Sequence, residues 1–266
     1  MSHPKQQSET TVHWRENVLF ETCRFAPGGP ESFPSHVHEE YQIYLSLDTP
    51  AQYGYRGGWR DVPKGSLFVI HSGEAHSARN LGDRQTWQSF RLMYPPLEIM
   101  NALLGEVSGR DMSGDDGAPF FADPLIGDRD LVRRLAEAHA APERGASELE
   151  RDCLLSSVLG DLILRHAQNR PRSPRFPRSR PAVKLVKEYL RDNVAQSTTL
   201  QDLAELTGLS SYHLNRTFKE EVGVPPHAYL TQARIDHAKT GLGLKPWTPE
   251  VYSYAAKLTS CFSFCC

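Results

Sequence analysis

The chain has 266 residues, of which 39% are apolar, and 30 Lys and Arg stand against 32 Asp and Glu. This length allows two domains, each with its own hydrophobic core. No apolar run approaches the roughly 18 residues that a membrane-spanning helix needs, and residues 1–12 are polar, unlike a signal peptide. We therefore expect a cytoplasmic protein without a membrane segment.

Charge is unevenly distributed along the chain. Residues 170–266 contain 14 Lys and Arg against 8 Asp and Glu, whereas residues 1–169 contain 16 against 24. The basic C-terminal part favours contact with nucleic-acid phosphates. Three of the five cysteines lie in the last six residues, and none forms a CxxC pair. The cysteines therefore predict neither a disulfide framework nor a metal site.

Residues 14–95 have the pattern of short β-strands. Alternating segments at 41–45, 52–55 and 67–70 are separated by turn signals such as Pro27-Gly28-Gly29 and Pro63-Lys64-Gly65. Many short strands with regularly spaced turns are typical of a jelly-roll barrel. Residues 1–168 are therefore expected to form a β-barrel domain with flanking helices.

Three short motifs in this region match a known type of domain. They are His36-Val37-His38-Glu39-Glu40-Tyr41-Gln42, then Gly58 with Pro63-Lys64-Gly65, and then His76. With these motifs the region resembles the cupin-type sensing domain that precedes the DNA-binding half of many AraC-type regulators. The resemblance implies a barrel that binds a small organic effector.

Metal-binding cupins hold a divalent ion with two His and a Glu of the first motif and one His of the second. His36, His38 and His76 match those histidines, but Gln42 stands where the pattern has Glu. A neutral amide removes a charge and a good ligand. We therefore expect no metal and no other cofactor, with a metal held by the three histidines, or purely structural histidines, as the alternatives.

The wall of an effector pocket would come from inward-facing positions of the strands. Aromatic side chains bury ligand surface, and a single Arg can orient an anion or a carbonyl. The alternative is that the aromatic residues only fill the core and that Arg91 faces solvent. The predicted ligand-binding residues are His36, His38, Tyr41, Gln42, Tyr44, Tyr55, His76, Trp87 and Arg91.

Two amphipathic helices are predicted after the barrel, at residues 128–141 and 147–168. Residues 97–117 contain Gly109, Gly114, Gly117 and an acidic cluster, which suggests an exposed loop. In the second helix, apolar residues recur at intervals of three and four along a broad face. In the AraC-type regulators that this part resembles, helices in this position carry the dimer contact. The resemblance therefore implies a homodimer through this helix, with packing on the chain's own barrel alone as the alternative.

A Pro- and Arg-rich linker, residues 169–181, separates this part from a second domain at residues 182–240. In the second domain, residues 199–223 read as two short helices around a turn. Gly208 suits the left-handed conformation that such a turn needs, and Ser210 or Ser211 can cap the helix that follows. The segment is predicted to be a helix-turn-helix.

The outer face of the second of these helices carries side chains suited to DNA. Asn and Arg make bidentate contacts with adenine and guanine, and Tyr and Lys suit sugar and phosphate. A solvated face of some other helical protein is the alternative. The predicted DNA-binding residues are Ser211, Tyr212, Asn215, Arg216 and Lys219.

The run from Leu203 to Ala238 also carries a family resemblance. Its elements include Gly208-Leu209-Ser210, Tyr212 to Lys219, and Gly223-Val224-Pro225. The run resembles the first half of the AraC/XylS-type DNA-binding domain, which implies base reading by Tyr212, Asn215 and Arg216. The second helix-turn-helix of that pattern is missing, and residues 241–266 read as an atypical tail, as expected of a truncation or an altered reading frame.

The sequence thus predicts an α+β protein with a cupin-like jelly-roll barrel followed by an all-α, incomplete helix-turn-helix domain. The predicted function is that of an AraC-type transcriptional regulator that binds double-stranded DNA under the control of a small-molecule effector. No enzyme activity is predicted. Two alternatives stay open at this point. One is a metal-dependent cupin enzyme, and the other is a paralogue that has lost DNA binding and acts through dimerisation.

Overall fold

A computed structural model describes residues 8–15, 18–80, 82–108, 117–170 and 179–241. Its N-terminal part consists of two antiparallel sheets. The first sheet has the strand order β1-β2-β9-β4-β7-β10, and the second has the order β3-β8-β5-β6. The strands are β1 (Ser8–Arg15), β2 (Val18–Phe25), β3 (Ser32–His36), β4 (Gln42–Ser46), β5 (Ala51–Tyr55), β6 (Gly58–Val62), β7 (Ser66–Ile70), β8 (His76–Arg79), β9 (Gln88–Tyr94) and β10 (Leu125–Ile126).

The two faces of the larger sheet bury different sets of side chains. All five residues of β4 are buried, which shows that both faces of this strand are covered. Tyr44 packs between the sheets with Tyr53 and Phe68, whereas Ile43 and Leu45 pack with the helices on the other face. The predicted cupin-like, sheet-rich fold class is confirmed.

Three helices cover the outer face of the larger sheet: α1 (Leu97–Ser108), α2 (Arg129–Ala140) and α3 (Glu148–His166). The caps of the last two follow from the sequence, because Asp128 and Ser147 accept hydrogen bonds from backbone N–H groups of the first turn. The prediction of a loop over residues 97–117 is wrong for its first part. Met100, Leu103 and Leu104 recur at helical spacing in α1 and are buried.

The C-terminal half is helical, with α4 (Arg180–Asp192), α5 (Leu200–Thr207), α6 (Ser211–Val222) and α7 (Pro226–Gly241). The turn between α5 and α6 has the predicted chemistry. Gly208 ends α5 with a φ of 66°, and the Ser210 side chain accepts from the N–H of His213 at the start of α6. A helix-turn-helix is therefore present. The tail at residues 242–266 lies outside the described residues, as does most of the linker.

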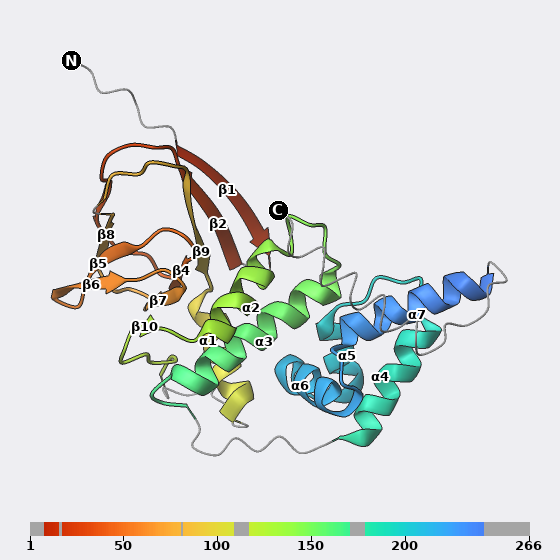
Figure 1. The fold of residues 1–266 in the computed structure, drawn as a ribbon. Helices are drawn as coiled ribbons and strands as arrows, with labels where there is room; N and C mark the ends of the chain where they lie inside the picture. Colours follow the sequence, from red (N-terminus) through yellow and green to blue (C-terminus); the bar gives the residue numbers. More distant parts are fainter. Residues whose placement is uncertain (1–7, 16–17, 81, 109–116, 171–178, 242–266) are drawn as a thin grey trace.

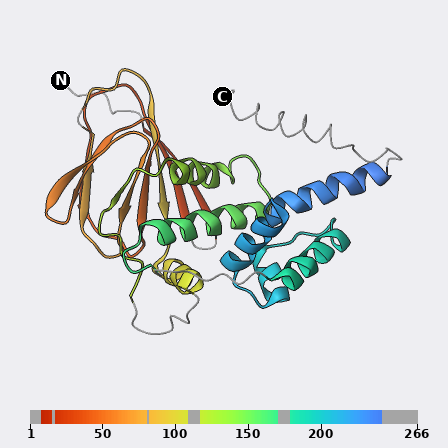
Figure 2. The same cartoon turned by 60° about the horizontal axis from the view of Figure 1, so that its bottom comes forward.

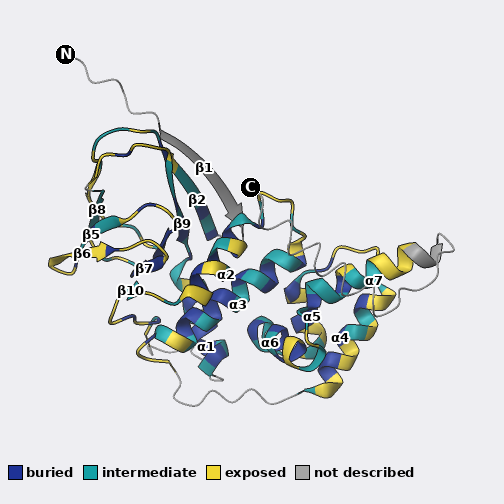
Figure 3. Ribbon diagram, in the orientation of Figure 1, coloured by how far each residue is buried: buried dark blue, intermediate teal, exposed yellow. Residues whose placement is uncertain are grey.

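Helix α3 lies between the two halves (Figures 1 and 2). Val158, Leu159 and Leu162 pack with the barrel-side helices and strands, while Leu149 and Cys153 pack with α4, α5, α6 and α7. Figure 3 shows α3 almost entirely in the colours of buried and half-buried residues. Within the described ranges, no helix is both long and apolar enough to cross a membrane.

Candidate functional site

A cavity of about 310 Å³ lies between the two sheets. Its walls come from β2, β4 and β9 of the larger sheet and from β3, β5 and β8 of the smaller one. The wall is mainly aromatic, with a polar region at the histidine motifs. The aromatic residues are Phe25, Phe33, Tyr44, Tyr53, Phe90 and Tyr94. The polar residues include Glu21, His36, Gln42, His76, Arg79 and Asn80.

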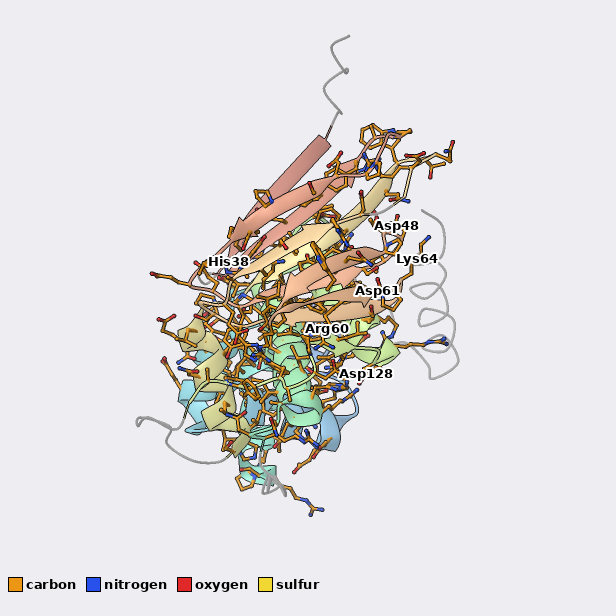
Figure 4. The ribbon with its side chains drawn as sticks, turned by 90° about the vertical axis from the view of Figure 1, so that its left-hand side faces the viewer. His38, Asp48, Arg60, Asp61, Lys64 and Asp128 are labelled. Atoms are coloured by element: carbon orange, nitrogen blue, oxygen red, sulfur yellow. The ribbon has the colours of Figure 1, made fainter. Side chains whose placement is uncertain are left out.

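Four of the predicted ligand-binding residues line this cavity: His36, Gln42, Tyr44 and His76. His38 lies directly beside them, because its Nε2 atom is 3.1 Å from Oε1 of Gln42. In a view from the barrel side, His38 lies toward one end of the strands, whereas Asp48 and Lys64 lie toward the other (Figure 4). The histidine motifs therefore meet at one end of the barrel.

Four other predicted residues are not part of this wall. The Tyr41 hydroxyl donates to the Pro119 carbonyl within the helix-side core. Tyr55 shares the inward face with Tyr53 but lies further along β5, where it contacts His71. The prediction that these two residues line the pocket is wrong for this cavity, because Tyr41 packs on the helix side of the larger sheet and the Tyr55 hydroxyl is directed to His71.

Arg91 and Trp87 lie on other surfaces. The Arg91 side chain crosses the outer face of the larger sheet, where its Nη1 atom donates to the Ala136 carbonyl of α2. Trp87 precedes β9, is 39% exposed, and lies under the guanidinium of Arg24 at 5.1 Å. Neither residue lines the cavity, so the expected pocket positions for them are also wrong.

The three histidines of the two motifs converge on one point. Their ligand atoms all lie within 4.8 Å of one another. Each ring has its Nδ1 atom near a backbone carbonyl: His36 at 2.9 Å from Pro34, His38 at 2.9 Å from Glu40, and His76 at 3.1 Å from Glu74. A carbonyl only accepts, so Nδ1 carries the proton and the Nε2 lone pairs are directed inward in the neutral rings.

Gln42 completes this polar cluster. Its Oε1 atom is 3.1 Å from Nε2 of His38 and 3.2 Å from Nε2 of His76, and its Nε2 atom donates to the Tyr53 hydroxyl at 3.2 Å. Burial, followed by the neighbouring histidines, lowers the pKa of His76 to about 4, which favours the neutral ring. Three imidazoles and an amide oxygen fit a divalent transition metal in donor type. An amide turned so that its NH₂ group faces both rings satisfies them without an ion.

Helix α6 carries the predicted DNA-binding residues, but two of them face the interior. Tyr212 and Asn215 are only 2% and 4% exposed. The expectation that they stand outward is therefore wrong for this conformation. The face that they share with Arg216 and Lys219 is turned toward α3, because the two halves of the chain pack on each other there.

Specific contacts hold this face of α6. The Tyr212 hydroxyl donates to Oδ1 of Asp161 at 3.0 Å, and the Tyr212 backbone N–H donates to Oε2 of Glu106 at 2.9 Å. The Asn215 amide donates to the Cys153 carbonyl at 2.9 Å. Burial raises the pKa of Glu106, and the hydrogen bond from Tyr212 opposes that effect.

The other predicted DNA-binding residues are more accessible. Lys219 is exposed, while Ser211 and Arg216 are half-buried. The Arg216 guanidinium pairs with Glu220 at 2.9 Å and donates to the Tyr212 hydroxyl at 3.3 Å. No motif in the sequence pointed to the acceptors Glu106, Cys153 and Asp161, because they lie in other helices. Helical periodicity alone could have placed the last two on one face of α3.

Comparisons with known proteins agree with this architecture. The family described as AraC-like ligand binding domain matches residues 21–159, and the family described as bacterial regulatory helix-turn-helix proteins, AraC family, matches residues 190–231. A cupin-like sheet domain joined to a helix-turn-helix defines a two-domain transcriptional regulator. The chain belongs to the AraC family.

Two curated relatives and one solved structure illustrate the similarity. The uncharacterized HTH-type transcriptional regulator YbfI of Bacillus subtilis (strain 168) is 28% identical over 90% of this chain and 85% of its own length. The HTH-type transcriptional activator RhaS of Mannheimia succiniciproducens is 21% identical over 78% of this chain and 74% of its own length. The crystal structure of the AraC-like transcriptional activator CuxR aligns with 88% of this chain and 81% of its own, at 12% identity and a TM-score of 0.43.

The names of these relatives bear on the choice between an enzyme and a regulator. Both curated relatives are named as transcriptional regulators or activators, and the helix-turn-helix family covers α5 and α6. The chain is accordingly a regulator, in agreement with the prediction made from its sequence.

Proposed function

We propose that this regulator binds DNA through α6 and that a small organic molecule in the cavity between the sheets controls this binding. The cavity carries the proposal. It lies between both sheets, it has about 310 Å³ of space, and it combines an aromatic wall with a cluster of polar groups at the histidine motifs. Such a combination is typical of sites for small ligands.

The lining indicates what kind of molecule fits. Phe25, Phe90 and Tyr44 offer flat apolar surface, so a planar or ring-shaped ligand would bury its faces against them. Gln42 and His76 offer both donor and acceptor atoms at one end of the cavity. We propose a small, largely apolar ring compound with a hydroxyl or carbonyl group at one edge.

A thermal-shift screen of small ring compounds tests the effector part of the proposal. A ligand should raise the melting temperature of the wild type, because binding to the folded state alone stabilises it. The effect should disappear in Ala78→Leu, which adds three carbon atoms to the cavity wall, and persist in Lys64→Ala on the barrel surface. If the ligand raises the melting temperatures of Ala78→Leu and Lys64→Ala equally, it does not bind in this cavity.

The DNA-binding part rests on α6 and on the basic C-terminal half. Arg216 and Lys219 lie one turn apart on its face, and each suits contact with bases or phosphates. Selection from a randomised duplex pool, followed by fluorescence anisotropy, should yield a sequence whose affinity falls with salt and with Arg216→Ala. Absence of any enriched sequence would favour the alternative of a paralogue that does not bind DNA.

A homodimer through residues 147–168 and a cytoplasmic location stay predictions. The apolar side chains of α3 are largely covered within the chain, since Leu155, Val158 and Leu162 are buried on the barrel side and Leu149 is buried on the other. A dimer would therefore use the polar, exposed positions near the ends of α3, such as Glu148 and Arg165. Sedimentation of the full chain measures whether dimers form.

A further inference from the structure

The face of α6 that is predicted to read DNA is already bound to the rest of the chain. Tyr212 and Asn215 lie three residues apart on this face, and both are more than nine-tenths buried. Because a DNA duplex and α3 would need the same side chains, they cannot occupy this face together. The contact surface consists of Glu106 of α1 and Cys153, Gly160 and Asp161 of α3, and we call it the α3 dock.

Gly160 leaves room in the α3 dock for the Tyr212 ring. A Cβ atom added at this position would overlap the Tyr212 ring, and the three atoms nearest to it all belong to that ring. Gly160 also lies in the middle of α3, where glycine costs about 1 kcal/mol of helix stability relative to alanine. The absence of a side chain here is therefore explained by the close approach of Tyr212.

Carboxylates of the sensing half occupy positions at helix N-termini of the kind that bind phosphates. Glu106 accepts from the backbone N–H of Tyr212 in the first turn of α6, and helix N-termini of this kind favour anions. Asp152 of α3 accepts in the same way from the N–H of Leu200 at the start of α5, at 3.2 Å. Both helices of the helix-turn-helix thus receive an acidic group from the sensing half.

We propose that the α3 dock is a second binding partner of α6 that competes with DNA, so that the conformation described is a closed form and DNA binding requires release of α6. This inference rests on the proposed function, because it assumes that α6 reads DNA. The fraction of molecules with a released α6 sets the apparent affinity for DNA.

A continuous set of contacts joins the effector cavity to the dock. His139 of α2 donates from Nε2 to the carbonyls of Glu21 and Leu92, and both of these residues line the cavity. Arg134 of the same helix donates to Oδ2 of Asp161 at 2.6 Å, while Oδ1 of Asp161 holds Tyr212. A ligand that displaces β2 or β9 would therefore shift α2 and the residue that binds Tyr212.

Alkylation of Cys153 measures release of α6 without DNA. The Cys153 side chain is 2% exposed and lies in the cluster formed with Leu214 and Phe218 of α6. In the full chain with the other four cysteines replaced by Ser, Gly160→Ala should accelerate its reaction with iodoacetamide. Glu106→Gln adds no heavy atom to the contact but removes the charge, and it should act in the same direction. Glu98→Gln, on the same helix as Glu106 but exposed at its first turn, is the matched control and should react like the parent.

Anisotropy with the duplex enriched by selection gives the second readout. Gly160→Ala and Glu106→Gln should bind it roughly 5-fold or more tightly than the parent, within the usual 5- to 150-fold range of coupling between sites, while Glu98→Gln should not. Circular dichroism melting shows whether each variant is folded. Unchanged alkylation in both dock variants, or faster alkylation without tighter DNA binding, would overturn the inference. If no form binds DNA, the proposed function fails, whereas the alkylation rates still decide whether the dock holds α6.

Discussion

The hydroxyl of Tyr212 donates to Oδ1 of Asp161 at 3.0 Å, across 51 positions of sequence. The other oxygen of the same carboxylate accepts from Arg134 at 2.6 Å. One carboxylate thus joins α2, α3 and α6, and it connects the helices on the barrel with the helix that carries the predicted DNA-binding face.

Asp161→Asn should weaken this junction. The variant removes the charge that pairs with Arg134 while the two side chains are only 20% and 16% exposed. Because hydrogen bonds to charged groups contribute more than neutral ones, we expect the free energy of unfolding to fall by about 1–3 kcal/mol. Urea denaturation measures this loss.

Glu137→Gln is the matched control, because the Glu137 side chain is 48% exposed and pairs with Arg133 at 3.7 Å on the surface. Exposed pairs of this kind contribute less than about 1 kcal/mol. An equal loss of stability in both variants would show that Asp161 has no special role at the junction.

The sequence predicted local features of the fold well, because short-range patterns determine them. Turn residues and alternating strands indicated the barrel, and Gly208 with Ser210 indicated the helix-turn-helix. The first helix after the barrel, α1, was missed because the following glycines and acidic residues obscured its apolar spacing. Its buried residues Leu103 and Leu104 do carry the helical pattern.

The site was harder to predict because strand alternation gives two faces without saying which one is internal. In β4, Gln42 and Tyr44 face the cavity, whereas Tyr41, just before the strand, faces the helices. The orientation of α6 depends on Gly160, which lies about fifty positions earlier in the chain. No local pattern around Tyr212 or Asn215 carries that information.

Lys219 should contribute to DNA affinity without contributing to sequence choice. Its side chain is exposed on the predicted DNA-binding face, and a lysine in this position suits a phosphate. Lys219→Ala should lower the slope of log K against log salt by about 0.9, the value for one phosphate contact, between roughly 50 and 200 mM salt. Anisotropy on two unrelated duplexes should show the same change, and Lys64→Ala in the barrel should show none. A change confined to one duplex would assign Lys219 to base reading instead.

Gln42→Glu should convert the histidine cluster into a better metal site. The substitution places a carboxylate 3.1–3.2 Å from two imidazole Nε2 atoms, where the wild type has a neutral amide oxygen. A negative oxygen ligand strengthens binding of a divalent cation, so we expect affinity for Zn²⁺ or Ni²⁺ to rise roughly tenfold or more. Competition against a chelating dye measures this affinity, and adding His38→Ala should abolish the gain. Equal affinities of wild type and Gln42→Glu would show that the three rings do not act together at this point.

His139 should make stability depend on pH. The ring is 1% exposed, and its Nε2 atom donates to the carbonyls of Glu21 and Leu92. Burial, followed by the charge of Arg91, lowers its pKa to about 4 from the ordinary value of 6.5. Between these two values the unfolded chain binds a proton that the folded chain does not, so the stability due to the neutral ring is complete above pH 6.5 and is lost as the pH falls toward 4.

A pKa difference of this size corresponds to at most about 3 kcal/mol. His139→Gln keeps a donor for the two carbonyls but does not titrate, so its free energy of unfolding should fall less between pH 7 and pH 5 than that of the wild type. Urea denaturation at both pH values measures this difference. Other buried histidines with a lowered pKa, such as His71, contribute equally to the pH dependence of both proteins, so their contribution cancels. Parallel losses in the two proteins would mean that His139 is protonated in the folded state at pH 5, contrary to the burial of its ring.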